Sequence, residues 1–121
     1  YIQDIILKAE NITSTGEKLT LVTALSYSGR DEILRAIKKA LNMNVNAVEI
    51  DEKFFGGLLD TAGLPPVDLI IRTSGEKRIS NFLLWQAAYA ELYFTETFWP
   101  DFTKEEFICA IQDYQRRERR F

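Results

Sequence analysis

Basic and hydroxyl side chains gather in a short stretch that follows the most apolar run of the chain. Arg72 comes directly after residues 67–71, and Arg78 and Ser80 follow within the next eight positions. Guanidinium groups bind phosphate oxygens in pairs, and a hydroxyl adds a neutral donor. A helix that begins just after such a loop adds free backbone N–H groups and the positive end of its dipole. These residue types at this spacing predict a site for an anion with several oxygens, above all phosphate or diphosphate.

The same residues also have a purely structural interpretation. Both arginines could pair with nearby carboxylates, for example Asp68 or Glu76. Ser80 could serve only as the N-cap of the helix that follows. Short motifs match by chance often enough that residue types alone leave both interpretations open.

Glu91 ends a stretch, residues 81–91, that is apolar almost all round and predicts a buried helix. A carboxylate at the C-terminal end of a helix is opposed by the helix dipole. A cationic partner or a metal ion would explain its presence, and so would a helix end that frays into solvent. Both explanations stay open.

Residues 29–31 form a second candidate site. Gly29, Arg30 and Asp31 follow an expected strand and open an expected helix, as the first site does. A glycine that allows a tight turn and an arginine in an ion pair account for them equally simply, and we favour this structural interpretation.

Alternating strands and helices must position these residues. Short runs rich in apolar and β-branched side chains predict buried strands over residues 19–26 and 67–71, and an aromatic, β-prone segment spans residues 93–98. Apolar residues at helical spacing predict helices over residues 1–11, 28–42, 50–59 and 103–114, with capping boxes at Ser28–Asp31 and Thr103–Glu106. The pattern predicts an α/β fold with a mainly parallel sheet flanked by helices.

Composition excludes several kinds of chemistry. The 121 residues contain no histidine and one cysteine, so this stretch cannot build a Ser-His-Asp triad or a cysteine-only zinc site. A metal ion would need oxygen ligands, which favours magnesium. The formal net charge of −3 makes nucleic acid a poor partner, although residues 116–120 form a basic tail. No apolar run reaches the ~18 residues of a membrane span.

Four segments closely resemble the cis-prenyltransferase family, specifically the bacterial undecaprenyl diphosphate synthases. They are LVTALSYSGRDEI (residues 21–33), PPVDLIIRTSGEKRISNFLLWQAAYAELYF (residues 65–94), FWPDF (residues 98–102) and RRERRF (residues 116–121). The long middle segment is the most specific. The resemblance implies a transferase that extends an allylic diphosphate, such as farnesyl diphosphate, by successive cis-condensations with isopentenyl diphosphate, giving undecaprenyl diphosphate for the lipid carrier of cell-wall synthesis.

Position by position, the resemblance assigns Arg72, Arg78 and Ser80 to the diphosphate of isopentenyl diphosphate, with Ile79 contributing its backbone N–H. It assigns Glu91 to the site of a magnesium ion, Mg²⁺. It further implies a homodimer in which Arg120 reaches the substrate site across the interface. The resemblance also implies a cytoplasmic enzyme that touches the membrane, if at all, only through its product.

One family motif is absent from the printed sequence. The His-Gly-Asn-Gly-Arg-Trp segment and the catalytic aspartate before it do not occur. We therefore expect residues 1–121 to be the C-terminal part of one synthase domain, incomplete as a sheet and inactive alone, with no catalytic residue of its own. Two other classes remain as alternatives: a non-catalytic partner subunit of a prenyltransferase, and an unrelated phosphate-binding α/β module.

Overall fold

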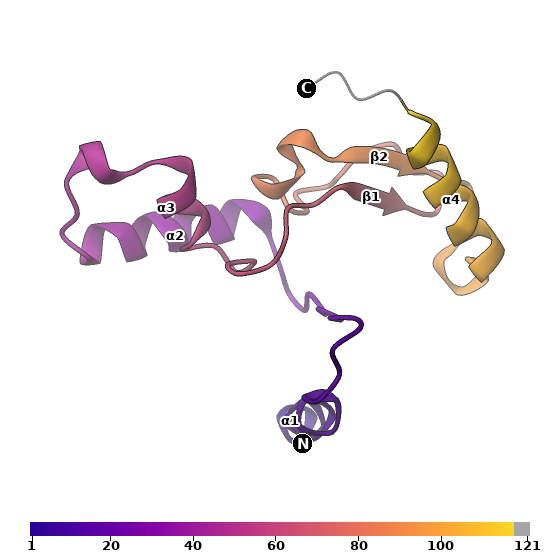
Figure 1. The fold of residues 1–121 in the computed structure, drawn as a ribbon, viewed down its shortest axis with the longest axis horizontal. Helices are drawn as coiled ribbons and strands as arrows, with labels where there is room; N and C mark the ends of the chain where they lie inside the picture. The colour runs from indigo at the N-terminus through magenta and orange to yellow at the C-terminus, as the bar shows by residue number, and fades with distance from the viewer. Residues whose placement is uncertain (118–121) are drawn as a thin grey trace.

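The computed structural model describes residues 1–117 and has a mixed α/β architecture (Figure 1). In chain order its helices and strands are α1 (Ile2–Thr13), α2 (Gly29–Asn42), α3 (Glu52–Gly56), β1 (Leu69–Arg72), β2 (Glu91–Phe94) and α4 (Lys104–Arg116). Short 3₁₀ turns lie at Ala47–Glu49, Gln86–Tyr89 and Trp99–Asp101. The two strands pair in parallel, with Leu69 opposite Glu91 and Arg72 opposite Phe94. The predicted α/β class with a parallel sheet is confirmed.

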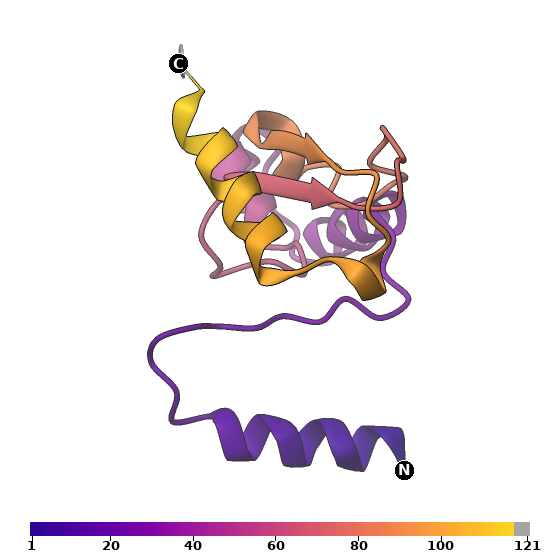
Figure 2. The same ribbon diagram turned by 90° about the vertical axis from the view of Figure 1, so that its right-hand side faces the viewer.

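Helices lie on two sides of this small sheet. α4 runs beside β1 and β2, and α2 and α3 lie next to each other away from α4 (Figure 1). α1 stands apart from the other elements, at the end of a long extended segment (Figure 2). Its apolar side chains are exposed, Ile2 by 69% and Ile12 by 70%. α1 therefore takes no part in the core of the described residues.

Residues 19–26 do not form the predicted strand. They are extended but carry no strand assignment, and Leu19 and Leu21 are more than four-fifths exposed. A strand exists only when a neighbouring strand accepts and donates its backbone hydrogen bonds. Within residues 1–117 the sheet consists of β1 and β2 alone, so this segment has no such neighbour. The expectation of a buried strand here was wrong.

Residues 81–91 do not form the predicted buried helix either. The segment consists of turns and the 3₁₀ turn Gln86–Tyr89, and β2 already begins at Glu91. Asn81 and Leu83 have left-handed backbone, with φ of 65° and 47°, which an α-helix excludes. Apolar residues on all sides indicate burial, but they do not distinguish a helix from packed turns.

Two of the helix starts agree with their capping signals. Thr103 and Glu106 form the predicted capping box, with the Thr103 N–H 3.1 Å from Glu106 Oε2. Asp51 accepts the Phe54 N–H at 2.7 Å and begins α3. Ser28 stands at the N-cap of α2 but makes no side-chain cap there, so the predicted Ser28–Asp31 box was wrong. Asn81 caps α2 instead, as described below.

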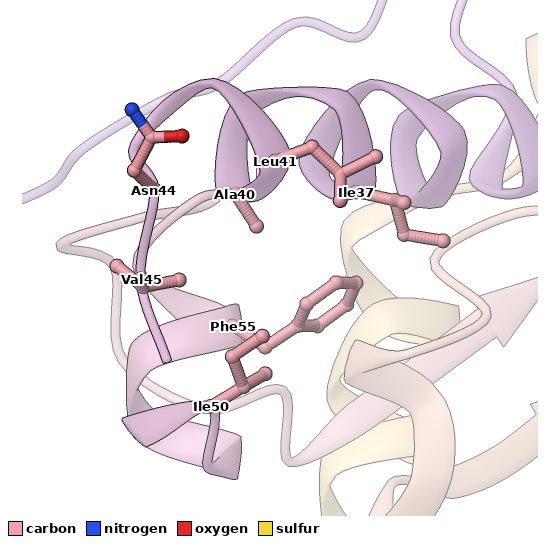
Figure 3. Close-up of a pocket in the computed structure, with 7 residues that line it drawn as sticks. All are labelled: Ile37, Ala40, Leu41, Asn44, Val45, Ile50 and Phe55. Carbon is pink, nitrogen blue, oxygen red and sulfur yellow. The ribbon is translucent and has the colours of Figure 1, made fainter. Parts of the chain in front are cut away.

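Two cavities open between the elements. The smaller, about 440 Å³, lies between α2 and the α3 region, and Figure 3 shows Phe55 and Ile50 facing α2 across it. The larger, about 1240 Å³, is lined by residues 22–27, 59–67 and 82–86 among others. No helix within residues 1–117 is both long and apolar enough to cross a membrane.

Candidate functional site

Arg72 is the last residue of β1, at the edge where ligands gather in open parallel sheets. The backbone carbonyl of Arg72 accepts the Thr95 N–H at 3.0 Å, which continues the pairing with β2. Its guanidinium Nη1 donates to Ser80 Oγ at 2.9 Å and to the backbone carbonyl of Arg78. The structure thus brings the strand arginine and the loop hydroxyl together across eight residues of sequence.

We call residues 73–81 the clamp loop. At its start the Ser74 N–H donates to the Thr97 carbonyl at 2.8 Å, and the Gly75 N–H donates to the Thr95 carbonyl at 2.9 Å. Gly75 has φ of 70°, and a side chain there would collide with the Glu96 carboxylate. The first half of the loop is therefore fixed to the chain that follows β2.

Arg78 and Ile79, the other two residues predicted to bind the diphosphate, lie in the second half of the loop. Arg78 contributes its backbone carbonyl to Arg72, while its guanidinium forms an ion pair with Glu76. The Arg78 side chain is 65% exposed, and such a surface pair is weak enough to exchange for a phosphate group. Ile79 accepts the Phe82 N–H at 2.9 Å, which closes the turn after it.

Glu91 lies at the other end of the sheet. It is the first residue of β2 and pairs with Leu69, three positions or about 10 Å along the strand from Arg72. Arg117 Nη1 donates to Glu91 Oε2 at 2.6 Å, and Arg117 Nε and Nη2 donate to Asp113 at 2.9 and 2.6 Å. These two carboxylates raise the pKa of Arg117. The structure does not bring Glu91 together with the Arg72 clamp of the same chain.

Among residues 1–117, Glu91 also lacks the neighbours of a metal ligand. Across the described part of the chain, no group of three or more acidic, histidine or cysteine side chains could hold an ion. A guanidinium in direct contact with the carboxylate further disfavours a cation beside it. In this arrangement Glu91 serves as an ion-pair partner that ties the end of α4 to β2.

Exchange of either partner tests this pairing. We expect Glu91→Gln and Arg117→Gln each to lower the free energy of unfolding by about 1–2 kcal/mol, because the pair is charge-assisted and only partly exposed. Because Arg117 also bonds Asp113, Arg117→Gln should cost more than Glu91→Gln, and the double variant should lose little more than Arg117→Gln alone. Urea denaturation measures all three, and fully additive losses would contradict the pairing.

Sequence reasoning missed a buried carboxylate. Glu32, on α2, is 1% exposed and accepts the Asp60 N–H at 2.8 Å, Gln86 Nε2 at 3.1 Å and the Tyr27 hydroxyl. Burial and the bond to Glu32 raise the pKa of Tyr27. Gln86 Nε2 also donates to Thr61 Oγ1 at 2.9 Å. The sequence did contain a signal for this burial. Glu32 lies four and eight residues before Ala36 and Ala40, the buried alanines of α2, and residues four apart lie on the same face of a helix.

The second candidate site, residues 29–31, has a structural role. The Gly29 N–H donates to the Asn81 backbone carbonyl at 2.8 Å, and the Arg30 N–H donates to Asn81 Oδ1 at 2.9 Å. Asp31 pairs with Arg35 at 2.7 Å. The first amide groups of α2 are thus bonded to the clamp loop. The expected details differ, because Gly29 begins the helix rather than a tight turn, and the ion pair of this segment joins Asp31, not Arg30, to Arg35.

Comparison with known proteins places this chain in a family. The sequence model described as "Putative undecaprenyl diphosphate synthase" matches residues 1–121. The isoprenyl transferase of Aquifex aeolicus is 57% identical over 87% of this chain and 45% of its own length. That of Treponema denticola is 55% identical over 99% of this chain and 52% of its own. The chain spans about half the length of the curated relatives it matches.

Solved structures agree. The lavandulyl diphosphate synthase of Lavandula x intermedia, in complex with dimethylallyl diphosphate, superposes with a TM-score of 0.92 and 35% identity, covering 99% of this chain and 53% of that one. A probable undecaprenyl diphosphate synthase from Campylobacter jejuni superposes with a TM-score of 0.81 and 39% sequence identity. This match covers 99% of this chain and 55% of that one. By the match along its whole length, by these relatives and by this shared fold, the chain belongs to the undecaprenyl diphosphate synthase family.

Proposed function

We propose that the chain forms the isopentenyl diphosphate site of a cis-prenyltransferase of the undecaprenyl diphosphate synthase type. The observation that carries this is the contact of Arg72 with Ser80 at the carboxyl end of β1, with Arg78 on the same loop. The reaction is the successive addition of isopentenyl diphosphate to an allylic diphosphate such as farnesyl diphosphate. The names of the relatives support this substrate class.

The clamp would act by binding and orientation. Arg72 is held by Ser80 and by the strand, so its guanidinium would already be positioned before the diphosphate binds. Arg78 would exchange Glu76 for a phosphate oxygen, and the Ile79 N–H would add a neutral donor. The larger cavity begins at Phe82, beside the loop, and would receive the hydrocarbon part. Fixing the substrate double bond toward the allylic carbon is catalysis mainly by orientation.

Enzymes of this family generally use a divalent metal ion, and we propose magnesium. When bound, the ion would neutralise charge on a diphosphate. The described residues do not form a site for this ion. Arg117 already bonds the Glu91 carboxylate, and no acidic cluster lies near it among residues 1–117. We therefore assign no step to the ion in this chain, and Glu91 as its ligand remains a proposal from family resemblance.

We further propose a homodimer in the cytoplasm that contacts the membrane only through its product. Phe98 and Trp99, which follow β2, are 65% and 73% exposed and would be covered by a second copy. Arg120, which the family resemblance carries across the dimer, lies outside the described residues.

Ligand binding tests the proposed function. We expect isothermal titration calorimetry to show that isopentenyl diphosphate binds at least tenfold more tightly than ATP, because the clamp carries no glycine-rich nucleotide loop. Equal affinity for nucleotides would favour an unrelated phosphate-binding module. Binding without product formation in the intact enzyme would favour a non-catalytic partner subunit.

A further inference from the structure

We propose that Asn81 is the positioning residue that fixes the clamp loop to the N-terminus of α2. This inference rests on the proposed function, because it concerns the affinity of the Arg72 clamp for its ligand. It does not add a group that touches the substrate.

Asn81 makes three bonds to the start of α2. Its backbone carbonyl accepts the Gly29 N–H at 2.8 Å, and its Oδ1 accepts the Arg30 N–H at 2.9 Å. Its Nδ2 donates to Ser28 Oγ at 2.6 Å. The first amide groups of a helix have no partner within the helix, so a residue distant in sequence satisfies them here. Ser28, the local capping residue, is bonded by Asn81 and makes no cap of its own.

The bonds hold a backbone that is otherwise unfavourable. Ser80 and Asn81 have φ of 47° and 65°, and two consecutive left-handed residues other than glycine are an unfavourable backbone conformation. Such a conformation persists only where surrounding contacts impose it. Asn81 provides those contacts, and Ser80 is the residue directly before it in the chain. The bond between Ser80 Oγ and Arg72 therefore depends on the anchor at Asn81.

The clamp loop packs closely against the start of α2 at Gly29. A Cβ at Gly29 would lie 3.0 Å from the Asn81 carbonyl oxygen and 2.9 Å from Leu84 Cγ. The absence of a side chain at Gly29 lets the loop approach the helix closely enough to bond. The clamp loop is thus fixed at both ends, to the chain after β2 through Ser74 and Gly75 and to α2 through Asn81.

Substitution of Asn81 by glycine tests the anchor, because glycine accepts the left-handed backbone and removes only the side-chain bonds. We expect Asn81→Gly to raise the dissociation constant for isopentenyl diphosphate about tenfold, because the two side-chain hydrogen bonds that hold the loop to α2 are lost. Asn44→Gly is the matched control, since Asn44 is also left-handed (φ 50°) and exposed on another turn. Asn44→Gly should change the dissociation constant for isopentenyl diphosphate by less than twofold. Calorimetry gives the constants, and each melting temperature is measured alongside.

Coupling to Ser80 separates positioning from a general loss of stability. When Asn81→Gly is added to Ser80→Ala, we expect binding to weaken little further, because both variants break the same connection. If Asn81 had only a structural role, Asn81→Gly would lower the melting temperature and the two effects on binding would add. If Asn81→Gly does not fold, Ser28→Ala and Gly29→Ala decide, with an expected rise of about threefold or more in each. Unchanged affinity in the anchor variants, while Arg72→Ala loses binding, would overturn the anchor alone. Unchanged affinity in Arg72→Ala would instead overturn the proposed function.

Discussion

Arg72→Ala should weaken the binding of isopentenyl diphosphate by between about thirtyfold and a few thousandfold, which corresponds to roughly 2–5 kcal/mol. Arg72 is half-buried at the end of β1, and its guanidinium bonds both Ser80 and the carbonyl of Arg78. Its loss removes the ordered positive charge of the clamp and releases the loop hydroxyl as well. Arg78→Ala should act in the same direction, since its guanidinium is free to leave an exposed pair with Glu76.

The measurement is the Michaelis constant for isopentenyl diphosphate in the intact enzyme, together with direct titration of the ligand. Arg72→Lys keeps the charge but loses the planar fork, so it should recover only part of the affinity. Lys38→Ala removes an exposed cation from α2 and should change nothing beyond experimental error. An unaltered Michaelis constant in Arg72→Ala would refute the clamp.

Glu32→Ala should lower the free energy of unfolding by about 3–5 kcal/mol. The carboxylate is fully buried and bonds the Asp60 N–H, Gln86 Nε2 and the Tyr27 hydroxyl, which come from three separate segments. Its removal leaves three partly buried donors without this acceptor and opens a space between α2 and the turns that follow the clamp loop. Each unsatisfied buried donor costs roughly 1–3 kcal/mol.

Chemical denaturation followed by circular dichroism measures this loss. Glu32→Gln keeps the shape and one acceptor oxygen, so it should cost about half as much. Glu10→Ala, which removes an exposed carboxylate of α1, is the matched control and should stay within about 0.5 kcal/mol of the parent. A loss of that small size in Glu32→Ala would show that the buried network does not contribute to stability.

Features that depend on neighbouring residues could be predicted from the order of amino acids. The apolar run before Arg72 forms β1, and Thr103 and Glu106 begin α4 as their types indicate. The residues that meet at the clamp, Arg72 and Ser80, were also predictable, because a strand end followed by a short loop brings them close. Sequence periodicity and capping are local, and the local chemistry was enough for these elements.

Features that depend on distant residues could not be predicted in this way. Residues 81–91 are apolar enough for a helix, but the bonds of Asn81 to the start of α2 hold the backbone in left-handed turns. Glu91 bears the same charge whether it holds a cation or Arg117, and its partner is decided by where α4 ends. A strand at residues 19–26 requires a neighbour that only the fold can place beside it. Hydrogen-bond partners separated by tens of residues are chosen by packing, which no local pattern encodes.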